Sequence, residues 1–196
     1  MNLQIEKKTF RRSLRLKNYD YNSRGVYFVT LCSYQRNHIL GRIVNEEIKL
    51  NATGVIVESV WYDLPNHYSN IELDAFVIMP NHVHGIVVLC GPVGAGLKPA
   101  PTTTKSHGLP EIVRALKTFS SRNINLFLKT PNRPIWQRGY YEHVIRDEES
   151  HNKIREYIIH NPFSWHLDRE NQERTGVDDF DNYLVRAGLK PVPTRR

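Results

Sequence analysis

At 196 residues the chain is long enough for one domain with tails, or at most two very small domains. Hydrophobic residues make up 40% of it and aromatic residues 10%, which excludes an intrinsically disordered protein, and the formal net charge of +7 favours an anionic partner such as nucleic acid. Its two cysteines, Cys32 and Cys90, form neither a zinc-binding spacing nor a disulfide framework. No stretch reaches the roughly 20 apolar residues that span a bilayer, and the N-terminus lacks a signal-peptide pattern. We therefore expect a cytoplasmic protein with no membrane partner.

Residues 1–24 are predicted to form a basic N-terminal arm. Residues 7–17 hold six basic side chains with three apolar ones between them. Two interpretations stay open: a solvated arm, or one that grips a DNA backbone. In the second case the contacts would come from Arg11, Arg12, Arg15 and Lys17.

A strand, a hairpin and a helix are predicted next. Residues 25–34 are β-branched and aromatic, which is typical of a buried strand. Residues 38–50 contain two short runs around Asn45-Glu46-Glu47, which predict a hairpin. A helix is expected from the cap residue Asn51 to about Leu64, where Pro65 would stop it. Its core-facing side chains would be Val55, Val57, Val60 and Trp61.

Two further strands and a long helix follow. The strands are expected at residues 71–79 and 82–89, joined by a tight connection at Pro80-Asn81. Residues 91–107 are predicted to be a flexible loop, because they have no apolar period. The helix is expected over residues 109–129. Its core-facing residues would be Ile112, Leu116, Phe119 and Leu126 or Phe127, with Arg114, Lys117 and Arg122 on other sides.

The last elements are a strand and a helix. Residues 135–146 are rich in aromatic side chains and predict a strand, and the acids at 147–149 are typical of a helix N-terminus. This helix would run to about His160 and be halted by Pro162. Residues 166–196 are assigned to a C-terminal tail, in which AGLKPVPT (187–194) nearly repeats AGLKPAPT (95–102).

The element order predicts the fold class. Several neighbouring strands lack a helix between them, which disfavours a parallel doubly wound sheet. The order instead favours an α+β sandwich, in which an antiparallel sheet has helices packed mainly on one face.

Two short patterns carry candidate chemistry. In a strand, alternate side chains share a face, so His82 and His84 would point the same way and converge on one metal ion. On the final helix, Tyr157 and Asn161 are four residues apart and share a face, so the amide oxygen of Asn161 would complete a metal site beside a phenol. Each pattern alone is more often structural. Together, ligands without a thiolate suit Mg²⁺ or Mn²⁺ on a phosphate, with Tyr157 as the nucleophile.

Longer segments resemble a known family. FVIMPNHVHGIVV (76–88) resembles the His-hydrophobic-His element of the HUH endonucleases. WQRGYYEHVIRDEESHNKIREYIIHNP (136–162) is similar to the tyrosine segment of the REP-associated tyrosine transposases, which are related to the transposases of small insertion sequences. The resemblance covers about residues 10–165, and residues 25–165 are assigned to the single-tyrosine HUH domain.

The resemblance implies a fold, a reaction and a set of site residues. The family fold is a ferredoxin-like sandwich. Its members cut single-stranded DNA that carries palindromic repeat hairpins, leaving a 5′-phosphotyrosine and a free 3′-hydroxyl. By position, His82, His84 and Asn161 would hold the divalent metal and Tyr157 would attack. Asn161 departs from the Gln that relatives outside this subgroup commonly have, and an asparagine has the shorter reach. The protein would act on nucleoid DNA as a monomer or a homodimer.

Three alternatives stay open. The protein is expected to cut and rejoin DNA, but a catalytically idle DNA-binding or regulatory protein of the same fold would have the same elements. An RNA-binding module is disfavoured, because no RNP-like strand is present. Tyr140 and Tyr141 are rival nucleophiles, one of which would face the core and the other the opposite layer.

Beyond the arm, DNA contacts are predicted for Arg114, Lys117, Arg122, Trp136 and Arg138.

Overall fold

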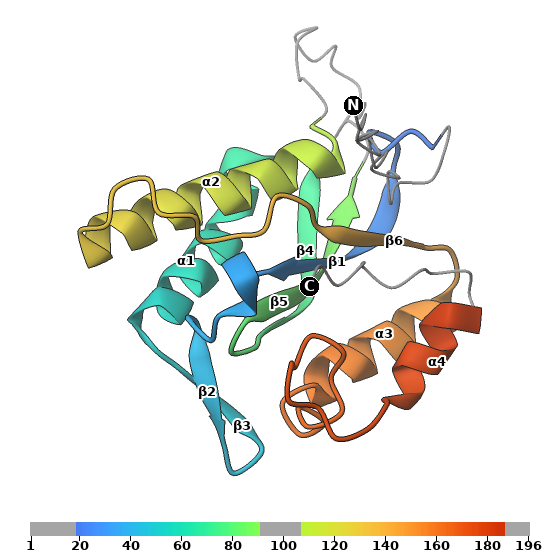
Figure 1. Cartoon of the computed structure of the whole chain (residues 1–196). Coiled ribbons are helices and arrows are strands. Elements are labelled where there is room, and N and C mark those ends of the chain that lie inside the picture. The colour runs from blue at the N-terminus through green and yellow to red at the C-terminus, as the bar shows by residue number, and fades with distance from the viewer. Residues whose placement is uncertain (1–18, 91–106, 187–196) are drawn as a thin grey trace, which may run out of the picture.

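The structure, a computed structural model, describes residues 19–90 and 107–186 (Figure 1). Several predictions therefore lie outside the described residues. They are the DNA contacts of Arg11, Arg12, Arg15 and Lys17, the loop at 91–107 apart from His107, and both AGLKP segments. Among the described residues, no helix combines the length and apolarity that crossing a bilayer requires.

A four-stranded antiparallel sheet forms the middle layer, in the order β4-β5-β1-β6. Its strands are β1 (Gly25–Cys32), β4 (Ile71–Ile78), β5 (His82–Leu89) and β6 (Tyr141–Ile145). With α1 (Ala52–His67) and α2 (Leu109–Leu128), the chain order is β1-α1-β4-β5-α2-β6, which is the split βαβ pattern of ferredoxin-like folds. The predicted α+β sandwich is confirmed.

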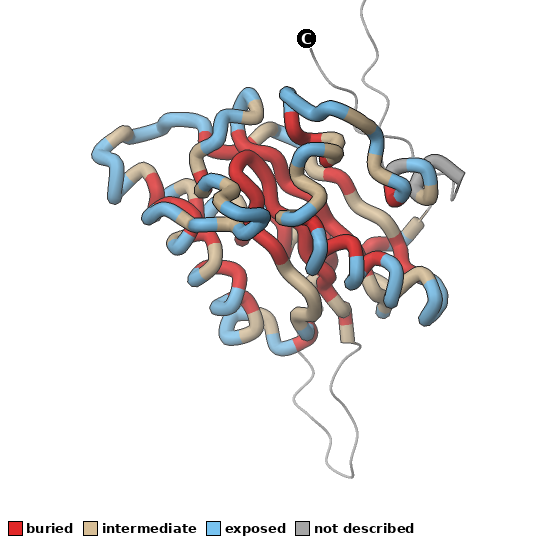
Figure 2. Tube along the Cα trace, turned by 90° about the horizontal axis from the view of Figure 1, so that it is seen from below, coloured by how far each residue is buried: buried red, intermediate tan, exposed pale blue. Residues whose placement is uncertain are grey.

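The helices cover both faces of the sheet (Figure 1). The two longer ones, α1 and α2, pack on one face, as the sequence predicted. The other face is covered by α3 (Glu148–His160) and α4 (Asp179–Arg186), so the covering is more even than predicted. Figure 2 shows the buried residues running through the middle layer, with exposed residues on both sides.

The face under α1 and α2 is a tightly packed apolar layer. Trp61 of α1 is 1% exposed and stacks on Phe76 of β4, with ring centroids 4.3 Å apart. The ring lies directly over Gly85 of β5, where a Cβ atom would stand only 2.4 Å from it. A glycine is therefore required at this close approach.

Two local predictions near the first helix are confirmed. β2 (Gly41–Val44) and β3 (Glu47–Leu50) form the hairpin, and its turn residues Asn45 and Glu46 both have positive φ, as in a type I′ turn. The side chain of Asn51 caps α1 by accepting from the backbone N–H groups of Thr53 and Gly54.

The end of α1 differs from the prediction. It continues through Pro65 to His67, because a proline in the last turn removes only one backbone hydrogen bond and the N–H of Tyr68 still bonds to Leu64. Val55 is 51% exposed and does not face the core, although Val57, Val60 and Trp61 do.

The predictions for α2 and β6 are wrong in detail. In α2, Phe119, Leu126 and Phe127 are exposed, whereas Ser120 is fully buried. β6 begins only at Tyr141. Trp136 instead forms an isolated bridge with Ser33, which lies between β1 and a short 3₁₀ turn (Tyr34–Arg36). By contrast, α3 begins after its cap Asp147 and ends at His160, as predicted.

Candidate active site

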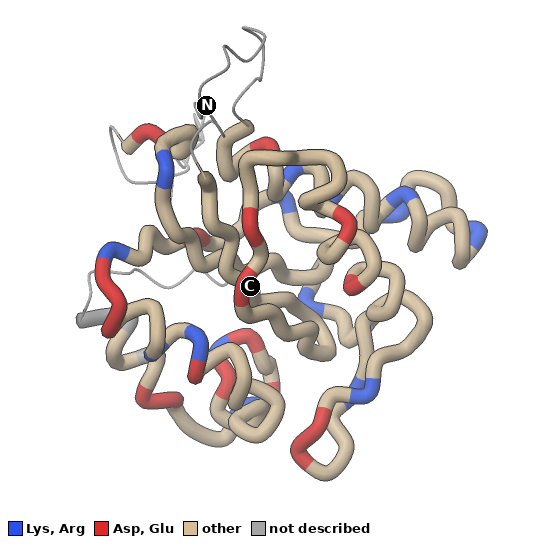
Figure 3. The backbone as a smooth tube through the Cα atoms, turned by 180° about the vertical axis from the view of Figure 1, so that it is seen from behind, with Lys and Arg blue, Asp and Glu red and all other residues tan. Residues whose placement is uncertain are grey.

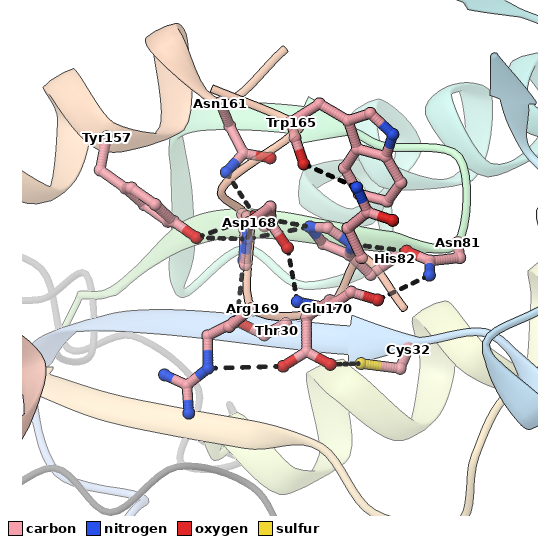
Figure 4. A network of polar contacts seen from close by, with 12 residues as sticks. Thr30, Cys32, Asn81, His82, Tyr157, Asn161, Trp165, Asp168, Arg169 and Glu170 are labelled. Atoms are coloured by element: carbon pink, nitrogen blue, oxygen red, sulfur yellow. Dashed lines mark hydrogen bonds and ion pairs between the residues drawn. The ribbon is translucent and has the colours of Figure 1, made fainter. Parts of the chain in front are cut away.

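Two buried histidines stand side by side on β5. His82 and His84 point toward α3, while Val83 between them faces the opposite layer, as strand alternation requires. The two rings are 0% and 1% exposed. Their Nε2 atoms are 3.0 Å apart (Figure 4). The predicted convergence of the pair is therefore present.

Each histidine is held by its other ring nitrogen. Asn81 donates through Nδ2 to the backbone carbonyl of Glu170, which turns its Oδ1 toward His82 Nδ1 at 2.8 Å. Because an amide oxygen only accepts, this contact assigns the proton of His82 to Nδ1, which leaves the lone pair of Nε2 facing His84. Thr30 Oγ1 lies 2.8 Å from His84 Nδ1. Such contacts orient imidazoles for a metal ion.

Burial keeps both histidines neutral. It lowers the pKa of His82 to about 4, and it also lowers the pKa of His84 below the ordinary histidine value. A neutral imidazole is the form that binds a metal ion. At physiological pH the pair is therefore ready to act as ligands.

Asp168 completes a cluster that the sequence analysis missed. Its Oδ2 lies 3.8 Å from His82 Nε2 and 3.9 Å from His84 Nε2, and the carboxylate is buried. Burial opposes its ionisation, but the facing histidines and a hydrogen bond from Asn161 hold its pKa below the ordinary range. His82, His84 and Asp168 are grouped closely enough to hold one metal ion.

The donor set fits a divalent ion. Two imidazole nitrogens face each other at 3.0 Å, and ligands at right angles about 2.1 Å from one ion stand about 3 Å apart. One carboxylate and no thiolate are present, which suits a catalytic ion better than a structural zinc. The Oδ1 of Asn161, whose amide nitrogen contacts Asp168, is buried without a hydrogen-bond partner among the described residues.

The phenol of Tyr157 reaches this cluster from α3. Its oxygen lies 3.2 Å from His84 Nε2 and donates to Asp168 Oδ2 at 3.2 Å. The ring is 8% exposed and is stacked on Phe180 of α4 at a centroid distance of 3.9 Å. All these groups come from one chain, so the predicted proximity of Tyr157 to the histidines needs no second subunit.

Asn161 lies at the cluster but contacts it in an unexpected way. Its Nδ2 donates to Asp168 Oδ2 at 2.8 Å, so in this arrangement the amide orients the carboxylate. Asp168 could hardly be predicted from sequence, because it lies in an irregular segment beyond α3 that has no hydrophobic period. The one available signal was chemical: a carboxylate within twelve residues of Tyr157. Asp168, Arg169 and Glu170, in the segment assigned to a tail, lie at the site (Figure 4), and Phe180 of the same segment stacks on Tyr157.

A layer of charged groups supports the cluster from behind. Glu170 is 2% exposed and pairs with Arg36, while Arg169 Nε lies 3.6 Å from its other oxygen. The thiol of Cys32 donates to Glu170 at 3.3 Å, and burial raises the pKa of Cys32 so that it stays protonated. This network fixes the segment that carries Asp168.

The predicted DNA contacts fall into two groups. Arg114, Arg122 and Arg138 are exposed. Lys117 instead donates to the backbone carbonyls of residues 137–139, and Trp136 is 7% exposed with its indole N–H bonded to Ser120. These two side chains hold the segment before β6, and the burial of Trp136 is at odds with stacking on a base. Figure 3 shows the basic residues scattered over the described part of the molecule.

The two rival tyrosines face opposite layers, as predicted. Tyr140 packs against the apolar cluster under α1 and α2. Tyr141 lies on the face of the sheet that carries His84.

Comparisons with known proteins agree with this picture. No protein-family model matches the chain. A Haemophilus influenzae protein of uncharacterised function is 37% identical over 171 residues, which are 81% of this chain and 92% of that protein. A solved structure of a REP-associated tyrosine transposase bound to a REP hairpin matches with a TM-score of 0.53 at 19% identity, over 90% of this chain and 89% of that one. The chain therefore belongs to one family with the Haemophilus influenzae protein and has the fold of the REP-associated tyrosine transposase.

Proposed function

We propose that the protein is a metal-dependent endonuclease and strand transferase that cuts and rejoins single-stranded DNA through Tyr157. One observation carries the proposal: the phenol oxygen of Tyr157 lies 3.2 Å from both His84 and Asp168 in a buried cluster suited to a divalent ion. The substrate would be DNA with palindromic repeat hairpins, since the transposase that shares this fold was solved with a REP hairpin.

The chain's own residues would carry out an in-line transfer. The oxygen of Tyr157 attacks the phosphorus, forming a phosphotyrosine with the 5′ end of the downstream fragment and breaking the bond to the 3′ oxygen of the upstream fragment, which leaves. Asp168, which accepts from the phenol in the structure, orients the attacking oxygen; the phenol loses its proton as the new bond forms and the leaving 3′ oxygen takes one up, so the protons balance. Because the new ester conserves the energy of the phosphodiester, the reverse reaction rejoins DNA without ATP.

His82, His84 and Asp168 would hold Mg²⁺ or Mn²⁺, with Asn161 orienting Asp168. When bound, the ion polarises the scissile phosphate and offsets the charge that develops on it.

Covalent trapping tests the proposal. A 3′-labelled hairpin oligonucleotide is incubated with the protein and Mn²⁺ or Mg²⁺, and a labelled adduct that survives denaturation is sought, because a 5′-phosphotyrosine retains the downstream fragment. Tyr157→Phe should abolish the adduct while preserving binding, and His82→Ala should abolish it while preserving the folded signal in circular dichroism. Tyr62→Phe, at an exposed tyrosine on the opposite face, is the matched control. An adduct formed by Tyr157→Phe would refute the assignment of the nucleophile.

A second function has one observation in its favour. The histidines are at most 1% exposed, and Phe180 covers the ring of Tyr157, so DNA reaches the site only if this cover moves. A catalytically idle DNA-binding or regulatory protein would keep such a closed site. Hairpin binding without any adduct in either metal would favour this second function.

The DNA surface is also a proposal. The N-terminal arm and the exposed Arg114, Arg122 and Arg138 would contact phosphates, which gives affinity that falls with salt. A complete set of site residues in one chain supports a monomer as the active form.

A further inference from the structure

A small cavity adjoins Tyr157, and His82 is not among the residues that line it. Its volume is about 10 Å³, enough for one water molecule or one phosphate oxygen. The residues that line it are Phe28, Thr30, His84, Tyr141, Tyr157, Arg169 and Glu170. Its floor follows the strand register, because Thr30 of β1 pairs with His84 on one side and with Tyr141 on the other. The cavity therefore adjoins His84, which is a candidate metal ligand.

The hydroxyl of Tyr141 has no hydrogen-bond partner among the described residues. Its side chain is 6% exposed and lines the cavity. A buried hydroxyl without a partner is destabilising, and such groups are few in folded proteins. Burial raises the pKa of Tyr141, so the phenol keeps its proton and is able to donate. A phenylalanine would fill the same space without this penalty.

Arg169 brings a positive charge to the same cavity. Its guanidinium lies 5.7 Å from the ring centroid of Tyr141, and its side chain is 13% exposed. Glu170 is paired with Arg36 as well as with Arg169, so two arginines share one carboxylate and the group has a net positive charge. Guanidinium donors match the geometry of phosphate oxygens.

We propose that this cavity is a phosphodiester subsite, in which Tyr141 and Arg169 donate to one non-bridging oxygen of the phosphate that Tyr157 attacks. The proposal rests on the proposed function. Donors placed where charge develops are among the strongest contributions to phosphoryl and acyl transfer. Tyr141 is thus a phosphate-binding residue rather than a rival nucleophile.

The decisive variant is Tyr141→Phe. We expect its thermal stability to equal or exceed that of the wild type, because an unpaired buried hydroxyl is removed. Its rate of adduct formation under single-turnover conditions should fall about 10- to 100-fold, as expected for a lost hydrogen bond to a charged group. Tyr62→Phe, which loses an exposed hydroxyl, should change neither quantity. A wild-type rate in Tyr141→Phe would overturn the proposal.

Arg169 variants test the second donor. Arg169→Gln should lower the adduct rate further than Arg169→Lys, which keeps the charge but loses the planar donors. Thermal unfolding of both variants is measured in parallel. A stable Arg169→Gln protein with a wild-type rate would overturn the role of Arg169. Loss of the adduct in Tyr141→Phe together with its persistence in Tyr157→Phe would instead make Tyr141 the nucleophile.

Binding without chemistry separates the subsite from the proposed function. In the Tyr157→Phe background, adding Arg169→Gln should weaken binding of a single-stranded oligonucleotide at least several-fold. If wild-type protein forms no adduct yet this loss of binding is seen, the proposed reaction fails and the subsite stands. Inorganic phosphate forms the second arm. Phosphate would overturn the DNA subsite and assign the cavity to a free anion if two results coincide. It would have to stabilise the protein against thermal unfolding only when Arg169 is present, and Arg169→Gln would have to leave oligonucleotide binding unchanged.

Discussion

Against α1 and α2 the sheet presents almost only apolar side chains, whereas against α3 and α4 it presents buried polar ones. Trp61, Val57 and Leu64 fill the first interface. The second contains Phe28 and Ile86 but also the histidine pair, Thr30 and Asp168. The same strands serve both, because alternate residues point to opposite faces.

The two faces of the sheet therefore have different roles: the apolar face stabilises the fold, and the polar face carries the candidate site. Burying polar groups lowers stability unless their hydrogen bonds are satisfied, so the α3 side is expected to contribute little net stability. The apolar side must supply most of it. Substitutions on the two faces should therefore have different signatures, and four predictions test this contrast.

The largest effect is expected on the apolar face. Trp61→Ala removes a ring that is 1% exposed and should lower the free energy of unfolding by about 3–5 kcal/mol. Urea denaturation measures the change. The neighbouring Tyr62, which is 62% exposed, provides the control, and Tyr62→Ala should stay within about 0.5 kcal/mol of the wild type. Equal losses in the two variants would contradict the contrast.

The next effect is expected from a metal ion on the polar face. An ion that binds only the folded protein adds about 2.7 kcal/mol when its concentration is 100 times its Kd. That corresponds to a rise in Tm of roughly 5–10 °C for a chain of this size. The comparison is between Mn²⁺ and EDTA, followed by thermal unfolding. Asp168→Ala should lose the rise and Asp63→Ala, at an exposed acid on α1, should keep it.

A smaller effect is expected where α3 is tied to the sheet edge. Asp74 of β4 accepts from Arg155 Nε at 2.8 Å and faces His151 Nε2 at 2.6 Å. Partial burial opposes its ionisation, but Arg155 and His151 outweigh this and keep the pKa of Asp74 below the ordinary value. Asp74→Asn should lower the free energy of unfolding by about 1 kcal/mol at pH 7.

The pH dependence of this loss gives its control. A lowered pKa means that the stabilisation is present above the unfolded value of about 3.9 and is lost as pH falls through the folded value. Urea denaturation at pH 7 and at pH 3 should therefore show the gap between wild type and Asp74→Asn closing in acid. A gap that is unchanged at pH 3 would mean that charge is not its source.

The smallest effect concerns the docking of α4 on α3. Tyr183 donates to Ser150 Oγ at 2.9 Å, and Tyr183→Phe should cost about 0.5 kcal/mol. A double-mutant cycle with Ser150→Ala isolates this pair from the other contacts of Ser150. Additive losses in the double variant would show that the two hydroxyls do not interact.

The regular elements of the site could be predicted from sequence, and its irregular part could not. Alternation along β5 placed His82 and His84 on one face, and the spacing of four on α3 placed Tyr157 and Asn161 together. Asp168 has no such rule, because its position depends on how the chain turns after α3. Its contact with the cluster is purely tertiary.

Polarity inside the core misled the prediction for α2. Ser120 occupies the middle of the buried stripe, where it bonds to Leu116 and accepts from Trp136. Because a serine interrupts the apolar period, Phe119 and Leu126 offered a more regular but wrong face. The indole N–H of Trp136 accounts for the serine, and this pairing is visible only in three dimensions.

The placement of Asp168 beyond α3 has a consequence for how the site would open. A cation bound by Asp168 and the two histidines would link the centre of the sheet to the segment that leads to Phe180. Removing the ion with a chelator would release the segment from Asp168 to Phe180. Protease cleavage after residue 165 would then report whether the ion is bound. A DNA strand would have to enter beneath this segment while the bound ion stays in place.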